Sequence, residues 1–298
     1  MAVPRPSERQ QIEPLPAHLV RGLVAAALAE DVGSGDVTSE AVIGEDAKMS
    51  ARIVAREPAL VAGLGVAKEV FAQVDRGVSF AAQVADGDRI EAGDEVAGVT
   101  GPARATLAAE RTALNFLQRM SGIATETARY VAAVVGTSAV IIDTRKTAPG
   151  LRALDKYAVR VGGGRLHRMG LFDGCLIKDN HIACAGGVKA AVAAARRRLG
   201  GRLNVQVEVT DLDEVEEALE AGADGLLLDN MDTAMLRQAV ARARGRAFLE
   251  ASGGISLDGV AEIAASGVDM ISVGSLTHSV RAIDFALEAR PQADRRGR

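Results

Sequence analysis

The sequence predicts an α/β protein whose C-terminal part is a parallel β/α barrel. After Gly136, six apolar runs typical of buried strands alternate with segments of helical pattern. Continuous apolar strands separated by helices indicate a parallel sheet that is covered on both faces. A barrel is favoured over an open, doubly wound sheet, because no GxGxxG motif follows the first strand and because polar or small residues follow every strand.

The strands and helices of the expected barrel follow in order along the chain. We expect strands at residues 139–143, 174–178, 204–209, 223–229, 247–252 and 269–274. Helical patterns cover residues 185–200, 210–222, 233–245 and 256–267. The second of these helices has clear end signals, because Thr210 or Asp211 can cap its first turn and Gly222 follows its last turn.

The N-terminal half has a different pattern. Residues 1–16 predict a flexible arm, and His18–Glu30 has the period of an amphipathic helix. Short β runs broken by Gly and Asp, with one helix among them, fill residues 48–99, and a long helix is expected at Thr106–Tyr130. The predicted units are an arm at 1–16, an N-terminal α/β domain at 17–120, a barrel at 121–277, and a C-terminal helix and tail at 278–298 that pack on the N-terminal domain.

The composition of the chain indicates a soluble, cytoplasmic protein. The chain has 298 residues, of which 48% are hydrophobic and 25% charged, and its formal net charge is −4. This charge, with 3% aromatic residues and no Trp, argues against nucleic acid as a partner. Two cysteines without a CxxC motif cannot form a disulfide framework. No apolar run reaches the length of a membrane span, so a membrane is not an expected partner either.

The residues that follow the six strands carry the chemistry. In a parallel β/α barrel the active site lies at the carboxyl ends of the strands. One polar strand end is more often a solvated loop than a site. Six ends in register, with cations first, acids in the middle and Gly and Ser last, indicate a site. In chain order they are Asp143-Thr144-Arg145-Lys146, Lys178-Asp179-Asn180-His181, Glu208, Asp229-Asn230, Ser252-Gly253-Gly254 and Gly274-Ser275.

The last two strand ends, in EASGGIS and ISVGSLT, predict a phosphate site. In barrels, the loops after the last two strands commonly bind phosphate through backbone N–H groups. Glycine lets the backbone approach a ligand closely. A pair of tight turns without a ligand is the alternative interpretation.

Cations outnumber acids in residues 143–181. Arg152, Lys156 and Arg160 lie four residues apart, so they are open to a second interpretation as an exposed helix face. The remaining cations adjoin strands or follow three glycines. Arg binds carboxylates as a planar fork, and Lys binds phosphate as a point charge. A pocket for a polyanionic ligand is therefore predicted around Arg145, Lys146, His167, Arg168 and Lys178.

Glu208 and Asp229 end the two middle strands. Two carboxylates that face a phosphate-rich pocket suit Mg²⁺ or ribose hydroxyls. They can also stabilise a cation that develops at a sugar carbon. No His/Cys set has zinc spacing and no GxSxG motif is present, so neither a zinc site nor a serine nucleophile is indicated.

Motifs along most of the chain carry a family resemblance. They are EDVGSGDVTS, ERTALNFLQRMSGIAT, DTRKTAPGLRALDKYAV, GGGRLHRMGL, LIKDNHI, VEVTDLDE, LLLDNM, EASGGI and ISVGSLTHS. Together they span Leu19 to Ser279 and resemble quinolinate phosphoribosyltransferase, the family also called carboxylating nicotinate-nucleotide pyrophosphorylase. One departure is Leu166, which stands where the family commonly has Asn before the His-Arg pair. If the Asn side chain orients this loop in the family, the loop that carries His167 is oriented in another way here, while the reaction class is unchanged.

The resemblance implies an N-terminal α/β sandwich domain and an open, seven-stranded, TIM-like α/β barrel. The seventh strand is then expected in or near residues 152–165, where no strand pattern is clear. The resemblance also implies a homodimer in which the N-terminal domain of one subunit caps the barrel of the other. In such a dimer Arg111 would enter the neighbouring site.

The reaction implied by the resemblance joins quinolinate and phosphoribosyl pyrophosphate, with Mg²⁺, and gives nicotinate mononucleotide, pyrophosphate and CO₂ for NAD biosynthesis. The residues implied to hold quinolinate are Arg111, Arg145, His167, Arg168 and Lys178. Those implied to hold phosphoribosyl pyrophosphate are Lys146, Lys178, Glu208, Asp229, Ser252, Gly253, Gly254, Val273, Gly274 and Ser275. Lys146, Glu208 and Asp229 are the expected catalytic residues, and the two acids are the expected metal ligands.

Two alternative functions explain the sequence less well. A paralogue of the same fold, such as the pyrophosphorylase-like proteins associated with molybdate transport, would keep the phosphate site and lose part of the dicarboxylate pocket. The cations retained in this chain argue against it. A non-catalytic sensor of a phosphoribosyl ligand, or a purely structural barrel, would not need both Glu208 and Asp229.

Overall fold

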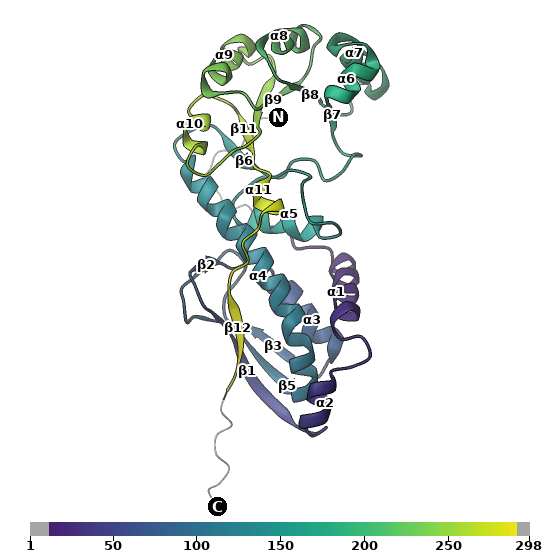
Figure 1. Cartoon of the computed structure of the whole chain (residues 1–298), viewed down its shortest axis with the longest axis vertical. Coiled ribbons are helices and arrows are strands. Elements are labelled where there is room, and N and C mark those ends of the chain that lie inside the picture. The colour runs from purple at the N-terminus through teal and green to yellow at the C-terminus, as the bar shows by residue number, and fades with distance from the viewer. Residues whose placement is uncertain (1–11, 291–298) are drawn as a thin grey trace, which may run out of the picture.

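One long helix joins the two domains of the chain in a computed structural model that describes residues 12–290 (Figure 1). Helix α4 (Ala103–Ala133) begins in the N-terminal domain and ends against the barrel. The predicted domain limit at residue 120 therefore falls inside a helix. Most of the predicted arm at residues 1–16, and the end of the predicted tail, lie outside the described residues.

The N-terminal domain is a four-stranded antiparallel sheet with helices packed on it. The sheet order is β12 (Phe285–Ala289), β1 (Lys48–Ala55), β5 (Glu95–Pro102) and β3 (Ser79–Ala82). A separate pair is formed by β2 (Ala59–Leu60) and β4 (Arg89–Ile90). Helices α3 (Leu64–Val74) and α4 contact the sheet, while α1 (Ala17–Asp31) packs on α3 and α2 (Val37–Val42) on α4. The predicted α/β sandwich is confirmed.

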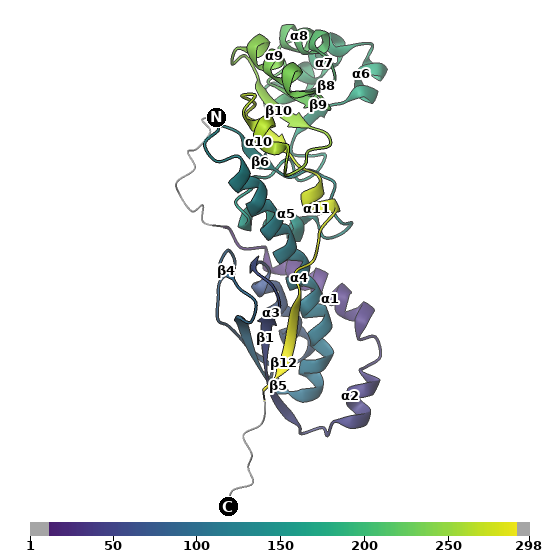
Figure 2. The same cartoon turned by 60° about the vertical axis from the view of Figure 1, so that its left-hand side comes forward.

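Strand β12 corrects the prediction of a C-terminal helix. It pairs with β1, where Phe285 lies opposite Ala55 and Leu287 opposite Ile53. Phe285 is buried beneath α4, and Ile283 before it is buried too. Apolar side chains at every second position favour a strand over a helix. The segment packs on the N-terminal domain as expected, beside β1 and α4 (Figure 2).

The C-terminal domain contains the six parallel strands that the sequence predicts. The sheet order is β6 (Val140–Ile142), β11 (Met270–Ser272), β10 (Phe248–Ser252), β9 (Gly225–Asp229), β8 (Val205–Val209) and β7 (Cys175–Ile177). Strands β6 and β7 do not pair with each other, so the barrel is open.

The expected seventh strand is reduced to a single bridge at Arg165. This residue pairs in parallel with Ile142 of β6, and its N–H donates to the Ile141 carbonyl at 2.8 Å. Most of the region in which the strand was expected forms helix α5 (Arg152–Val161). The bridge nevertheless extends the sheet by one position beyond β6, at the side where the barrel opens.

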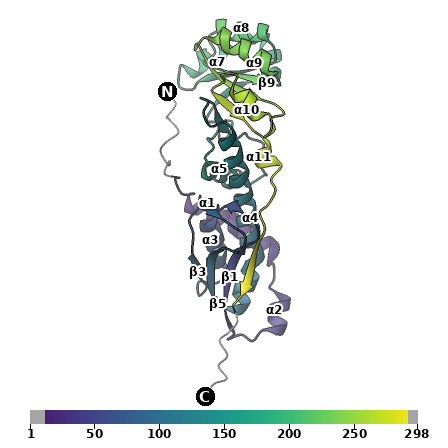
Figure 3. The ribbon, with the colours of Figure 1, turned by 90° about the vertical axis from the view of Figure 1, so that its left-hand side faces the viewer.

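Helices cover the outer face of the barrel strands (Figure 3). Asp211 is the residue that caps α8, accepting from the N–H groups of Asp213 and Glu214. Between residues 12 and 290, no helix has the length and apolar character needed to cross a membrane. After α5, the helices of this domain are α6 (Asp179–Ala185), α7 (Val188–Leu199), α8 (Leu212–Glu220), α9 (Thr233–Ala243), α10 (Val260–Ala264) and α11 (Ser275–His278).

Successive side chains of the barrel strands alternate between an apolar outer face and a polar inner face. Val207, Leu228 and Ala251 belong to the buried cluster that joins the strands to the helices. Because neighbouring residues of a strand point to opposite faces, the residues between them face inward. The inner face therefore carries Gln206, Glu208, Leu227, Asp229, Glu250, Ser252 and Ser272.

The chain crosses directly over α4 on its way to β12. A Cβ atom on Gly122 of α4 would lie 2.2 Å from the Arg281 carbonyl oxygen. We expect Gly122→Ala to lower the free energy of unfolding by about 1–3 kcal/mol, because the backbone of the crossing segment has to move. Thermal and chemical denaturation would measure the loss.

The matched control is Gly65→Ala in α3. Gly65 is exposed, and a Cβ atom there meets nothing within 4 Å. The higher helix propensity of Ala should leave this variant neutral or up to ~1 kcal/mol more stable. Similar responses of the two variants would contradict the close crossing.

Candidate functional site

A buried ion pair ties α5 to the end of β6. Lys156 is 1% exposed, and its Nζ donates to Asp143 Oδ1 at 2.7 Å. The interpretation of Lys156 as part of an exposed helix face is therefore wrong. Asp143 Oδ1 also accepts from His167 N at 2.7 Å, while Lys156 Nζ donates to His167 O at 3.1 Å. Burial raises the pKa of Asp143 and lowers that of Lys156, and their mutual attraction opposes both shifts.

Both ring nitrogens of His167 face protein atoms. Nδ1 accepts from Arg168 N at 2.7 Å, and Nε2 lies 3.5 Å from Glu250 Oε2. Glu250 Oε2 also accepts from Gln206 Nε2 at 2.7 Å. Glu250 is not among the site residues predicted from the sequence. The available signal was a charged residue in the apolar run AFLEAS, on the same strand face as Ser252.

Arg145 and Arg168 bring two guanidinium groups into one place. The Nε atom of each is buried, and neither has a hydrogen-bond partner within residues 12–290. Arg168 Nη1 donates to the Gly174 carbonyl at 3.0 Å. Burial, followed by the charge of Arg145, lowers the pKa of Arg168. Buried unpaired donors on like charges are costly, so this pair is the strongest sign of an anion pocket.

The predicted acids lie at the ends of the middle strands. Glu208 forms an ion pair with Lys178, which lies at the end of β7. The Lys178 side chain is 43% exposed. Asp229 lies opposite Ser252 of β10 and accepts from Asn230 Nδ2 at 2.7 Å. Glu208 pairs with Leu227, two residues before Asp229, so both acids face the inside of the barrel.

The two Gly-rich strand ends adjoin these groups. Gly253 has φ +97°, and a Cβ atom there would lie 2.2 Å from Asn230 Oδ1, so only glycine fits. Asn230 itself has φ 54°, which is uncommon for a residue other than glycine. At the next strand end, a Cβ on Gly274 would lie 3.2 Å from Lys146 Cδ. Lys146 therefore lies beside the second Gly-rich end.

A hydrogen-bond network from α4 holds the loop that carries Lys146. Arg119 Nε donates to Asp155 Oδ1 at 2.9 Å, and Arg119 Nη2 donates to the Thr277 carbonyl at 3.1 Å. Asp155 Oδ2 accepts from Ala148 N at 3.1 Å, and Thr277 Oγ1 donates to the Lys146 carbonyl at 2.8 Å. Three helices thus fix one loop. Arg119 is not among the predicted site residues, because nothing in the sequence distinguishes it from other helical arginines.

Arg111 does not join the other predicted residues. It is exposed on α4, eight residues before Arg119 and hence about 12 Å from it along the helix axis. Within residues 12–290 it has no hydrogen bond or ion pair. A role for Arg111 in a site of this kind needs a second chain, and that role stays a prediction.

The acids at the strand ends are too few to enclose a metal ion by themselves. The described residues contain no group of three or more His, Cys, Asp or Glu side chains placed to hold one. Mg²⁺, however, commonly takes one or two carboxylates and completes its shell with water and substrate phosphate. Glu208 and Asp229, on neighbouring strands and one face, fit such a shared site.

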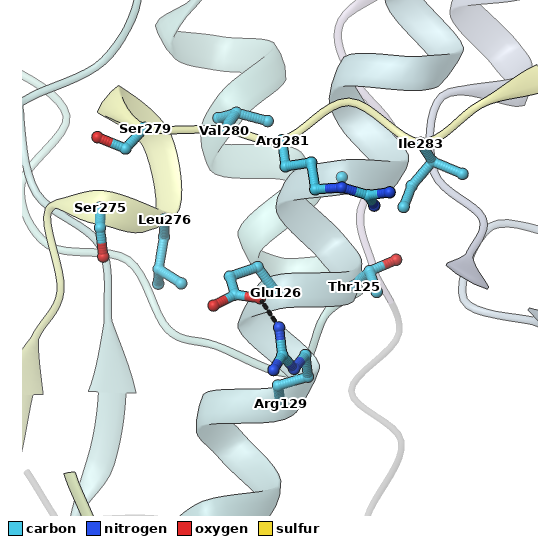
Figure 4. Close-up of a pocket in the computed structure, with 10 residues that line it drawn as sticks. Thr125, Glu126, Arg129, Ser275, Leu276, Ser279, Val280, Arg281 and Ile283 are labelled. Carbon is cyan, nitrogen blue, oxygen red and sulfur yellow. Dashed lines mark hydrogen bonds and ion pairs between the residues drawn. The ribbon is translucent and has the colours of Figure 1, made fainter. Parts of the chain in front are cut away.

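A cavity of about 290 Å³ lies beside the last strand end, where α4, α11 and residues 279–283 meet (Figure 4). Its two arginines are already paired, Arg129 with Glu126 at 2.7 Å and Arg281 with Glu57 at 2.8 Å. Ser275 also lines it. Because its cations are neutralised, this cavity is a weaker candidate for an anion than the Arg145–Arg168 pair.

Fold and site together define a two-domain α/β-barrel protein with cations, two carboxylates and Gly-rich loops at its strand ends. Comparison with known families is more specific. The N-terminal and C-terminal domains of quinolinate phosphoribosyl transferase match residues 36–121 and 123–288. The chain belongs to the quinolinate phosphoribosyltransferase family.

Individual relatives agree over nearly the whole chain. The probable nicotinate-nucleotide pyrophosphorylase (carboxylating) of Bacillus subtilis is 42% identical over 259 residues, which cover 87% of this chain and 89% of the relative. The chloroplastic nicotinate-nucleotide pyrophosphorylase (carboxylating) of Arabidopsis thaliana is 43% identical, covering 92% of this chain and 83% of the relative. The solved nicotinate-nucleotide pyrophosphorylase of Francisella tularensis has a TM-score of 0.88 at 40% identity, covering 94% and 99% of the two chains.

The buried ion pair predicts strong coupling between its two partners. We expect Lys156→Met to lower the free energy of unfolding by about 3–5 kcal/mol, because it leaves Asp143 buried without its counter-charge. The double variant Asp143→Asn/Lys156→Met should recover more than ~1 kcal/mol of that loss. Denaturant titrations of the single and double variants would measure the coupling.

Arg160→Met serves as the matched control on the same helix. Arg160 is half-buried and is not part of the ion pair. Its replacement should change stability by less than about 1 kcal/mol. Additive losses in the Asp143 and Lys156 variants would contradict the proposed coupling.

Proposed function

We propose that the chain transfers the phosphoribosyl group of phosphoribosyl pyrophosphate to quinolinate with loss of CO₂. The products are nicotinate mononucleotide, pyrophosphate and CO₂, and the reaction belongs to NAD biosynthesis. Membership of the quinolinate phosphoribosyltransferase family supports this reaction. The observation that carries the proposal within the site is the Arg145–Arg168 pair. The buried Nε donors of both residues lack a hydrogen-bond partner within residues 12–290, and an anion would satisfy them.

Quinolinate suits the cationic side of the site because it has two neighbouring carboxylates on a planar ring. Arg145 and Arg168 offer planar donors for them, and Lys178 adds an accessible cation. The ring of His167 lies between Glu250 and the backbone amide of Arg168. Lys178 also faces Glu208, so it joins the quinolinate side to the acidic side of the site.

Phosphoribosyl pyrophosphate suits the other strand ends. Its 5′-phosphate would be held by the backbone N–H groups of Gly253, Gly254, Gly274 and Ser275, with Ser252 beside them. The Val273 N–H already donates to the Ile142 carbonyl at 3.0 Å, so it is not available to the phosphate as the sequence suggested. Lys146, beside Gly274, is in reach of the pyrophosphate as a point charge. Glu208 and Asp229 would face the ribose. They would also hold Mg²⁺, which when bound would neutralise the charge of the leaving pyrophosphate.

The proposed chemistry has two stages. The pyridine nitrogen of quinolinate forms a bond to C1 of the ribose while the bond from C1 to the pyrophosphate oxygen breaks. The carboxylates of Glu208 and Asp229 stabilise positive charge at C1. The bond to the 2-carboxylate then breaks, CO₂ leaves, and the ring carbon takes a proton. The quaternary nitrogen eases this step because it stabilises the carbanion left behind.

A homodimer with shared sites, and a cytoplasmic location, complete the proposal. Arg111 is exposed and lies far along α4 from the strand ends of its own chain. An arginine in that position is available to a second subunit. In the proposed dimer, it supplies a further guanidinium to the quinolinate carboxylates of the partner site.

The reaction is tested with quinolinate labelled at the 2-carboxylate, phosphoribosyl pyrophosphate and Mg²⁺. The purified chain should release labelled CO₂ and form nicotinate mononucleotide. Arg145→Ala should raise the KM for quinolinate about 10- to 100-fold, because a charge-assisted hydrogen bond is lost. The KM for phosphoribosyl pyrophosphate should change far less. Steady-state kinetics would measure both.

Arg237→Ala, which removes an exposed arginine of α9, is the matched control and should change neither KM. Equal losses for both substrates in Arg145→Ala would contradict the assignment of Arg145 to the dicarboxylate. Binding of quinolinate without release of CO₂ would favour a sensor. Failure to bind quinolinate would favour a paralogue with another substrate.

Subunit sharing is tested by mixing two inactive variants. A chain with Arg111→Ala and a chain with Lys178→Ala should each lose activity, because each lacks one cation of the shared pocket. Mixed dimers should regain a fraction of the wild-type activity, since one of their two sites contains both residues. Mass spectrometry would verify the mixed dimers. No recovery in verified mixtures would argue against sharing.

A further inference from the structure

The geometry points to Glu250 as a positioning residue of the dicarboxylate pocket, which acts through the ring of His167 on Arg168. The inference rests on the proposed function, in which Arg168 binds a carboxylate of quinolinate. Glu250 is neither at a strand end nor in the Gly-rich loops. It lies two residues before Ser252, on the same inner face of β10.

Glu250 is placed to orient the His167 ring. Its side chain is 2% exposed, and Oε2 lies between Gln206 Nε2 at 2.7 Å and His167 Nε2 at 3.5 Å. Oε1 has no hydrogen-bond partner within residues 12–290. A buried carboxylate with one free oxygen is costly unless nearby cations or donors compensate it. Here the donors and cations that compensate the Glu250 carboxylate are groups of the dicarboxylate pocket itself.

The tautomer of His167 follows from its other nitrogen. Nδ1 accepts from the Arg168 N–H at 2.7 Å, so Nδ1 carries no proton. The proton of the neutral ring is therefore on Nε2, which faces Glu250. With this tautomer, one ring nitrogen faces Glu250 and the other accepts from the backbone amide of Arg168. Glu250 therefore orients that amide through the ring.

The backbone of His167 leaves only the ring to be oriented. Its N–H is held by Asp143 and its carbonyl by Lys156. Glu250 then fixes the side-chain torsions of His167. The His167 ring in turn holds the backbone amide of Arg168, the residue that carries the guanidinium group. This sequence of contacts places the unpaired Nε of Arg168 beside Arg145.

Charge compensation supports the same role. Burial raises the pKa of Glu250, but the His167 and Gln206 side chains that face its carboxylate outweigh burial and lower it. The Glu250 carboxylate in turn raises the pKa of Arg168, against the effects of burial and of Arg145. It stabilises the charged form of the arginine while no substrate carboxylate is bound.

The test compares Glu250→Leu, which removes the acceptor at similar volume, with Glu250→Gln, which keeps an acceptor oxygen. Glu250→Leu should raise the KM for quinolinate about tenfold or more, with kcat and the KM for phosphoribosyl pyrophosphate changed less than about threefold. Glu250→Gln should recover most of that loss. The control is Asp224→Asn, which neutralises a carboxylate at the opposite ends of β8 and β9 and should change neither KM.

A second measurement does not depend on the folding of the leucine variant. Nitrogen NMR of the wild-type protein, with His167→Asn to assign the signal, should show His167 protonated at Nε2 and not at Nδ1. A proton on Nδ1, or exchange between tautomers, would overturn the inference. So would equal losses for both substrates, or no loss, in folded Glu250→Leu. An inactive wild-type protein would contradict the proposed function. The tautomer measured by NMR would still test the Glu250–His167 contact in that case.

Discussion

The site depends on the buried ion pair between Asp143 and Lys156. The two residues come from the end of β6 and from α5, and together they bind both the N–H and the carbonyl of His167. The seventh strand is only one bridge long, so the sheet itself cannot fix this loop. Burying two charges is expensive and rarely the best route to stability. Here it fixes a loop in which Arg165, His167 and Arg168 follow three glycines.

The N-terminal domain takes part in the site through α4. Arg119 reaches from this helix to Asp155 and to the Thr277 carbonyl, so the loop after β6 and helix α11 are anchored to the same side chain. The chain then crosses Gly122 and returns as β12 to the first sheet. Through helix α4 and strand β12, the junction between the two domains is continuous with the hydrophobic cores of both. A shift of α4 would therefore move the strand-end loops, although the helix carries none of the polar strand ends.

The sequence predicted what periodicity and strand order determine. The six barrel strands are continuous apolar runs, and their ends necessarily meet in a parallel barrel. Burial of polar side chains was not predictable in this way. The spacing of Lys156 suggested an exposed face, since nothing local shows that Asp143 lies opposite it. Glu250 was missed for the same reason, and β12 was mistaken for a helix because its partner strand lies over 200 residues away.

Arg145 and Lys146 are neighbours in sequence, yet they lie beside different groups of the site. The Nε of Arg145 is buried near Arg168, whereas Lys146 is exposed beside Gly274. Their carbonyls are held separately, by Arg152 at 3.3 Å and by Thr277 Oγ1 at 2.8 Å. In the proposed reaction a ring nitrogen has to meet C1 at about 3–3.5 Å, which demands a fixed relation between the two ligands. One rigid loop that presents a planar cation to one ligand and a point charge to the other supplies that relation.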